Sequence, residues 1–337
     1  MPDTPDPRLA ALARWLADEA GLAVDRIEPA SIDASFRRYF RVYTGGRQYI
    51  AMDAPPDKED SEPFLRVAGW LREMGLNAPA VHAHDLSVGY LLLDDLGERQ
   101  YLDELLERPG RADALYHDAL VALDRMQSAG ADYRAGLPPY DVRLLERELA
   151  LFRDWLCGTH LGLEFSAADE ADWRLTRELL IEASLAQPRV FVHRDYHSRN
   201  LMVREHDNPG ILDFQDAVDG PLTYDLVSLL KDCYVSWPEH RVRAYAFDFY
   251  RRAERRLPRA FDRDAFLRAF ELTGVQRHLK AAGIFARLNH RDGKARYLAD
   301  VPRTLRYVLE VVPRHAELAF LGRLVSERCL PALEPAK

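Results

Sequence analysis

Residues 190–217, VFVHRDYHSRNLMVREHDNPGILDFQDA, decide both the fold and the chemistry. Three short apolar runs, RVFVH, NLMV and GILDF, predict strands separated by polar loops. A hairpin-like arrangement of these strands would bring Asp195, Asn200 and Asp213 to one end, facing one cleft. That set suits phosphoryl transfer, in which a carboxylate orients the attacking hydroxyl and oxygen ligands hold Mg²⁺ against the phosphates of ATP.

Composition limits the class of protein. The chain of 337 residues is 47% apolar and 10% aromatic, enough to bury a core, and its length favours two lobes. The first thirty residues carry acids throughout and lack the pattern of a signal peptide, and no apolar run is long enough for a membrane helix. Three widely spaced cysteines fit neither a disulfide framework nor a metal cage. We therefore expect a soluble cytoplasmic protein that does not bind membranes.

Charge is unevenly distributed along the chain. Residues 1–216 carry 24 basic and 39 acidic side chains, whereas residues 217–337 carry 22 basic and 15 acidic ones. The net charge of -8 argues against general nucleic-acid binding. Nothing in the sequence indicates an obligate protein partner.

Periodicity predicts an α+β chain with a small sheet lobe and a larger helical lobe. Residues 1–95 contain a leading amphipathic helix, a hairpin in SFRRYFRVYTGGRQYIAM, a helix over 62–75, and two further strands. Residues 99–337 are mostly helical, for example over 142–156, except for the strands of the opening stretch. We expect the first lobe to bind nucleotide and the second to hold the catalytic and acceptor sites.

The motif HRDYHSRN, followed by LDF, resembles the catalytic loop and metal-binding aspartate of aminoglycoside phosphotransferases and related small-molecule kinases. The resemblance covers residues 25–325 and implies the bilobal protein-kinase-like fold. It implies that Asp195 is the catalytic base and that Asn200 and Asp213 bind Mg²⁺. It also implies that His193 and Asp225 support the catalytic loop.

A closer resemblance narrows the substrate. The segments SFRRYFRV, AMDAPP, FQDAVDGPLTYDLVSLLKDCY and IFARLNHRDGKARYLADVPRTLRYV are similar to the bacterial N-acetylmuramate/N-acetylglucosamine kinases of cell-wall recycling. This implies ATP-dependent phosphorylation of the anomeric C1 hydroxyl of these sugars. The basic C-terminal third also suits a sugar with a lactyl carboxylate better than a polycationic aminoglycoside. The candidates for sugar contact are the polar residues at the end of an apolar helix: Asn289, His290, Arg291 and Asp292.

Position 52 departs from the kinase pattern. A lysine that contacts the phosphates is expected on the third strand, but Met52 stands there, and Lys58 is the only lysine before residue 217. An arginine of the phosphate loop would then take this role, and among the arginines of that strand we favour Arg38. The nucleotide-binding candidates are Ser35, Phe36, Arg38 and Asp94.

Two alternative functions remain open at the level of sequence. One is a kinase for another small hydroxyl compound, such as an aminoglycoside, choline or homoserine. The other is a catalytically silent regulator that binds nucleotide, which the missing lysine at position 52 would favour. The intact set of Asp195, Asn200 and Asp213 favours an active kinase over this second alternative.

Overall fold

The computed structural model describes residues 6–31 and 36–333 and divides into two compact units. Unit 1 comprises the chain up to Glu104 together with Arg199–Asp216, and unit 2 comprises Leu105–Ser198 together with the chain from Ala217 onward. The predicted division at residues 95–99 assigns residues 199–216 to the second lobe, and these domain boundaries stay a prediction.

Unit 1 is built on a five-stranded antiparallel sheet. The strands are β1 (Arg26–Ser31), β2 (Arg38–Thr44), β3 (Arg47–Asp53), β4 (Val81–Asp85) and β5 (Tyr90–Asp94), in the spatial order β1-β2-β3-β5-β4. The β2–β3 connection turns at Gly45 and Gly46, which both have positive φ. The hairpin predicted from TGG is thereby confirmed.

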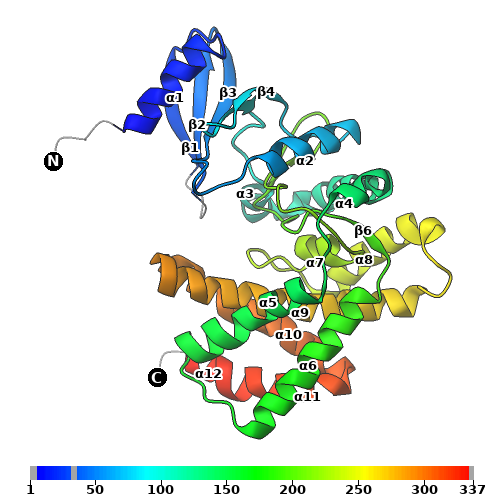
Figure 1. Ribbon diagram of the computed structural model, residues 1–337. Coiled ribbons are helices and arrows are strands. Elements are labelled where there is room, and N and C mark those ends of the chain that lie inside the picture. Colours follow the sequence, from blue (N-terminus) through cyan, green and yellow to red (C-terminus); the bar gives the residue numbers. More distant parts are fainter. Residues whose placement is uncertain (1–5, 32–35, 334–337) are drawn as a thin grey trace. The chain divides into compact units, whose positions relative to one another are not determined.

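Three helices accompany the sheet of unit 1. Helix α1 (Pro7–Asp18) lies against the strands (Figure 1) and buries Leu12, Trp15 and Leu16 in a cluster with sheet residues. Helix α2 (Glu62–Glu73) ends just before Gly75, which has a φ of +72°, in agreement with the predicted helix. Helix α3 (Tyr101–Glu107) runs across the boundary between the units.

The strands of the opening stretch are shared between the units. In unit 1, β7 (Leu201–Met202) pairs with β8 (Gly210–Ile211), whereas in unit 2, β6 (Arg189–Val192) pairs with β9 (Val218–Pro221). The three predicted strands therefore exist, but they do not form one hairpin. The sequence analysis missed β9 because its residues, VDGP, have the composition of a turn.

Unit 2 is mainly helical. Its helices are α4 (Ala112–Ala129), α5 (Val142–Leu151), α6 (Ala167–Leu185), α7 (Tyr224–Leu230), α8 (Glu239–Ala253), α9 (Arg263–Asp292), α10 (Val301–Val311), α11 (Ala319–Arg323) and α12 (Leu330–Leu333). Helix α5 continues as a π-helical segment over Phe152–His160, so the helix predicted over residues 142–156 is confirmed. Leu145, Leu149, Phe152 and Leu156, which repeat along one face, are fully buried, whereas Val142 at the start of the helix is exposed. No helix within the two described ranges has both the length and the apolar content needed to cross a membrane.

The long helix α9 passes through the core of unit 2. Its apolar residues Leu272, Val275 and Leu279 are fully buried in the main hydrophobic cluster. At Gly283 it approaches α5 so closely that an added Cβ would lie 2.3 Å from the carbonyl carbon of Leu151. This crossing therefore requires glycine and fixes the position of the polar residues that α9 contributes to the site.

Candidate active site

The backbone around Asp195 is held from below by two fully buried side chains. The carboxylate of Asp225 accepts hydrogen bonds from the backbone nitrogens of His193 at 2.7 Å and Arg194 at 2.9 Å. The backbone nitrogen of Asp195 in turn donates to Nδ1 of His193 at 3.2 Å. These hydrogen bonds fix the backbone on either side of Arg194, which agrees with the supporting role expected for His193 and Asp225.

Arg194 anchors the same loop through its side chain. Its φ of 79° lies in the left-handed region, which costs a non-glycine residue about 1 to 3 kcal/mol and is most often found at functional sites. Its guanidinium contacts the buried carboxylate of Glu148 at 2.6 Å, and Lys280 contacts the same carboxylate at 2.9 Å. Burial alone would raise the pKa of Glu148, but Lys280 and Arg194 outweigh it and lower this pKa to about 2. The loop is therefore tied to a permanently charged anchor.

Asp195 itself is ionised at neutral pH. Burial opposes the charge, but nearby cations, with Lys280 the largest and His197 next, hold the pKa of this carboxyl below its usual range. A carboxylate with a low pKa is a weak base. It is suited to orient a hydroxyl and to accept its proton late, when the bond to phosphorus has drawn electron density from the hydroxyl oxygen and made its proton acidic.

Asp195 lines a pocket formed within unit 2. The other lining residues are His197, Asp232, Cys233, Tyr234, Arg277, Lys280, Ala281, Ile284 and Phe285. Asp232 accepts hydrogen bonds from the backbone nitrogen and hydroxyl of Ser198 and from the backbone nitrogen of Tyr234. Its carboxylate thus holds the loop, and five of the lining residues belong to α9.

The predicted sugar-binding residues lie further along α9. Asn289, His290, Arg291 and Asp292 occupy its last turn, and none of them lines the pocket. Nε2 of His290 lies 3.0 Å from Nδ1 of His160, and the guanidinium of Arg291 contacts Asp292. Their contact with a sugar stays a prediction. The sequence analysis missed Arg277 and Lys280, although a pair of basic residues inside the apolar segment TGVQRHLKAAGIF was a usable signal.

The two predicted metal ligands come together in unit 1. Asn200 precedes β7 and Asp213 follows β8, and the backbone nitrogen of Leu212 donates to the carbonyl of Asn200 at 2.9 Å. The side-chain nitrogen of Asn200 then lies 3.2 Å from the carboxylate of Asp213, whose φ is 61°. One carboxylate and one amide carbonyl fit Mg²⁺, which usually keeps waters and binds nucleotide phosphates at its other positions.

Met52 is fully buried in β3 and cannot take the place of the expected lysine. It lies opposite Tyr39 on β2 and Leu91 on β5 in the register of the sheet. The next residue, Asp53, is the charged group at this point of the strand, and its side chain is completely buried. Any phosphate contact in unit 1 must therefore come from a residue other than position 52.

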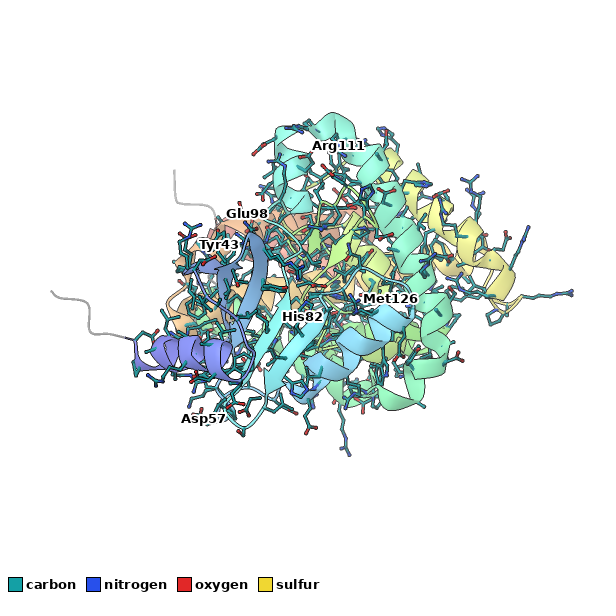
Figure 2. All side chains as sticks on the ribbon, turned by 90° about the horizontal axis from the view of Figure 1, so that it is seen from above. Tyr43, Asp57, His82, Glu98, Arg111 and Met126 are labelled. Atoms are coloured by element: carbon teal, nitrogen blue, oxygen red, sulfur yellow. The ribbon has the colours of Figure 1, made fainter. Side chains whose placement is uncertain are left out.

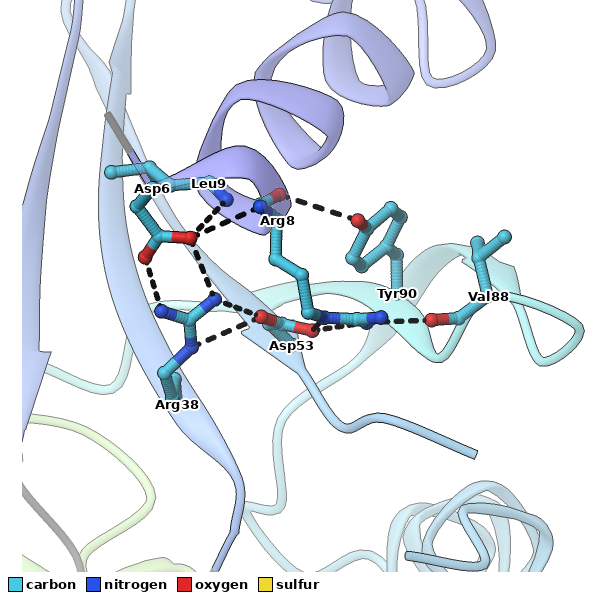
Figure 3. A network of polar contacts seen from close by, with 7 residues as sticks. All are labelled: Asp6, Arg8, Leu9, Arg38, Asp53, Val88 and Tyr90. Atoms are coloured by element: carbon cyan, nitrogen blue, oxygen red, sulfur yellow. Dashed lines mark hydrogen bonds and ion pairs between the residues drawn. The ribbon is translucent and has the colours of Figure 1, made fainter. Parts of the chain in front are cut away.

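Arg38 is held in a network of ion pairs with Asp53 (Figure 3). It donates to Asp53 through Nε at 3.1 Å and Nη2 at 2.5 Å, and it also contacts Asp6, the N-cap of α1. Arg8 of α1 donates to Asp53 at 2.9 Å and to the carbonyl of Val88 at 2.8 Å. The network holds the first turn of α1 against the sheet.

The other nucleotide-binding candidates have different surroundings. Phe36 is 65% exposed, and Ser35 lies outside the described residues. Asp94, at the end of β5, accepts a hydrogen bond from the backbone nitrogen of Ala80 at 3.0 Å. Its carboxylate also lies 2.7 Å from Nε2 of His82. His82 belongs to β4 and is labelled in Figure 2. The side chain of Asp94 therefore fixes the end of the sheet.

Comparison with known proteins identifies relatives over most of the chain. Residues 26–266 match the model of the phosphotransferase enzyme family. The N-acetylmuramate/N-acetylglucosamine kinase of Pseudomonas aeruginosa is 52% identical over 88% of this chain and 87% of its own length. The protein of the same name from Pseudomonas putida is 46% identical over 96% of this chain and 97% of its own length.

Solved structures share the fold at low sequence identity. An ADP-bound aminoglycoside phosphotransferase superposes with a TM-score of 0.60 at 16% identity, covering 90% of this chain and 98% of that chain. Choline kinase LicA from Streptococcus pneumoniae superposes with a TM-score of 0.61 at 10% identity, covering 90% of this chain and 100% of that chain. At these identities the match establishes the protein-kinase-like fold alone.

Proposed function

The chain belongs to the phosphotransferase enzyme family and is a kinase, and we propose that it transfers the γ-phosphoryl group of ATP to the anomeric C1 hydroxyl of N-acetylmuramate and N-acetylglucosamine. The observation that carries the choice of substrate is the identity of 52% and 46% with two kinases of that name. The products would be sugar 1-phosphates, available for cell-wall recycling.

Asp195 is the proposed catalytic base. It would orient the C1 hydroxyl and take its proton as the new bond to phosphorus forms. The hydrogen bonds from His193 and Arg194 to Asp225 support this proposal, because they restrict the backbone that presents the carboxylate. Glu148 and Lys280 would keep the surrounding charges fixed during the reaction.

Asn200 and Asp213 are the proposed ligands of Mg²⁺, whose charge would offset that of the phosphates. Only four residues, 196–199, separate Asn200 from Asp195, so the metal pair and the base are joined by a short segment. The proposed nucleotide contacts are Ser35, Phe36, Arg38 and Asp94. Arg38 could bind phosphate only if the phosphate replaced one of its present ion-pair partners. Phosphate would have to replace Asp6, whose side chain is 37% exposed, because Asp53 is fully buried.

The setting of the reaction follows from its substrates. We propose a cytoplasmic enzyme that acts on small molecules, because ATP is supplied in that compartment. Nucleic acid and membranes have no role in this proposal, and it needs no obligate protein partner. The described residues contain the proposed base, its supporting residues and the proposed metal pair in one chain.

An assay of ADP release over an acceptor panel tests the proposed function. The panel contains N-acetylmuramate, N-acetylglucosamine, glucose, kanamycin and choline with ATP and Mg²⁺, and Asp195→Asn is the control. We expect turnover on the two N-acetyl sugars that is lost in the control. Turnover restricted to kanamycin or choline would overturn the substrate, and nucleotide binding without turnover on any acceptor would favour a silent regulator.

A further inference from the structure

Arg277 is a buried cation for which the described part of the chain provides no hydrogen-bond acceptor. Its side chain is only 6% exposed and lines the pocket that contains Asp195. Within residues 6–31 and 36–333 its guanidinium makes no hydrogen bond or ion pair, and its Nε is buried without a partner. The guanidinium carbon lies 5.8 Å from the centroid of the Tyr224 ring.

Such an arrangement is costly unless a ligand completes it. Burying a charged group without hydrogen bonds strongly opposes folding. The carboxylates of Asp195 and Asp232 favour the charge of Arg277 at longer range but do not accept a hydrogen bond from it. An unsatisfied guanidinium in a pocket next to a catalytic residue is therefore a candidate for binding an anionic group of the substrate.

The second cation of the pocket is already neutralised. Nζ of Lys280 contacts Glu148 at 2.9 Å and the hydroxyl of Tyr224 at 2.8 Å. Lys280 is thus a fixed part of the network that anchors the catalytic loop. Of the two basic residues that α9 places in the pocket, Arg277 is the one whose donors remain for a ligand.

The shape and neighbours of Arg277 favour a carboxylate attached to an apolar group. A planar guanidinium matches the two oxygens of a carboxylate and binds it through two parallel hydrogen bonds. Ala281, Ile284 and Phe285 follow Arg277 by four, seven and eight residues, so they lie on the same face of α9 and form an apolar wall beside it. That wall suits the methyl group of a lactyl substituent or one face of a sugar ring.

We propose that Arg277 binds the lactyl carboxylate of N-acetylmuramate and is the residue that favours this sugar over N-acetylglucosamine. The inference rests on the proposed function, since of the two proposed acceptors only N-acetylmuramate carries a carboxylate. N-acetylglucosamine has a hydroxyl in place of the lactyl ether and would gain at most one hydrogen bond from Arg277. The phosphates of ATP have their own proposed partner in the Mg²⁺ that Asn200 and Asp213 would hold.

Kinetics of Arg277→Met on both sugars test this inference. Methionine keeps most of the length of the side chain and removes the charge. A charge-assisted hydrogen bond contributes about 1.5 to 3 kcal/mol, so we expect KM for N-acetylmuramate to rise about 10- to 100-fold. KM for N-acetylglucosamine should rise by at most about fivefold, since its uncharged hydroxyl accepts one hydrogen bond from Arg277 at most. Arg277→Lys, which keeps the charge without the planar fork, should give an intermediate KM for N-acetylmuramate.

Arg287→Met is the matched control. Arg287 lies on the same helix, is half-buried, and also has an Nε without a partner, but it does not line the pocket. Arg287→Met should leave the ratio of kcat/KM for the two sugars unchanged. Calorimetric binding of each sugar to Asp195→Asn, with and without Arg277→Met, provides a readout that does not depend on turnover.

The possible outcomes separate the inference from the function on which it rests. Selective loss of N-acetylmuramate binding supports the inference. Equal losses for both sugars would overturn it, and a raised KM for ATP would then assign Arg277 to a phosphate. Failure of the unmodified chain to phosphorylate either sugar would instead overturn the proposed function.

Discussion

The buried carboxylate of Asp225 accepts a hydrogen bond from the backbone nitrogen of His193 at 2.7 Å. Its second oxygen accepts one from Arg194, so a single side chain from α7 holds the two residues that precede the proposed base. Burial raises the pKa of Asp225 to about 7, although both hydrogen bonds favour its charged form. The support of the catalytic loop is therefore coupled to pH.

This coupling predicts a specific pH dependence of stability. An aspartate in an unfolded chain has a pKa of about 3.9. The folded chain therefore binds an extra proton above that pH, and the resulting stabilisation is present below about pH 4 and is lost as pH rises through 7. We expect the melting temperature of the wild type, relative to Asp225→Asn, to fall between pH 5 and pH 8 in thermal denaturation. Parallel curves for the two proteins would contradict this.

Removal of the proposed base should abolish turnover selectively. Asp195→Asn keeps the size of the side chain but cannot accept the proton, so kcat should fall by about 10² to 10⁴. Binding of ATP, measured by calorimetry, should stay within about threefold of the wild type because the proposed nucleotide contacts lie on other residues. Turnover equal to that of the wild type would rule out Asp195 as the base.

Asp213→Asn should raise the concentration of Mg²⁺ needed for half-maximal activity. It replaces the carboxylate of the proposed metal pair by a neutral amide, which is a weaker ligand for a hard cation. The matched control is Asp216→Asn, because Asp216 is an exposed carboxylate three residues further along the same loop. An unchanged magnesium titration in Asp213→Asn, or an equal shift in the control, would count against the assignment.

Two arginines that share Asp53 allow the phosphate role of Arg38 to be tested. Arg38→Met and Arg8→Met each remove one partner of this buried carboxylate, and both arginines are partly exposed, so each should lower the free energy of unfolding by about 1 to 3 kcal/mol. If Arg38 also binds phosphate, only its variant should raise KM for ATP, by about tenfold or more. Equal KM values for ATP in Arg38→Met and Arg8→Met would show that Arg38 only holds α1 against the sheet and does not bind phosphate.

The close approach of the two helices at Gly283 predicts that one added methyl group there strongly lowers the stability of the fold. Gly283→Ala places a Cβ against the backbone of Leu151 and should destabilise the chain by about 2 to 3 kcal/mol in urea unfolding. Gly274→Ala, on the same helix, would meet nothing nearer than 3.7 Å and should be neutral or stabilising by up to about 1 kcal/mol. Similar midpoints for the two variants would contradict the packing described here.

Local patterns in the sequence predicted much of the fold and part of the site. Asp195, Asn200 and Asp213 could be identified because the catalytic motif is short and its spacing is fixed along the chain. Likewise, the β2–β3 hairpin follows from two glycines that adopt positive φ at adjacent positions. These features depend on neighbours in the sequence, which periodicity and turn composition describe well.

Other parts of the site depend on contacts between distant residues. Arg277 and Lys280 lie about 80 residues after Asp195 on a helix that is buried on several sides, so periodicity does not show which of its polar residues reach a pocket. The partners of Arg38 are Asp6, the N-cap of α1, and Asp53 of β3. The first residue of β9, Val218, pairs with Val192 of β6, which lies 26 residues earlier in the chain. Such pairings follow from the packing of elements, which the sequence does not state directly.

Identification of the product tests the central proposal most directly. The unmodified chain is incubated with ATP, Mg²⁺ and N-acetylmuramate, and the sugar phosphate is examined for acid lability and for a free reducing end. We expect a phosphate at C1, which is released by mild acid and leaves no reducing end in the intact product. An acid-stable sugar phosphate that still reduces, or the absence of any sugar phosphate, would contradict anomeric phosphorylation.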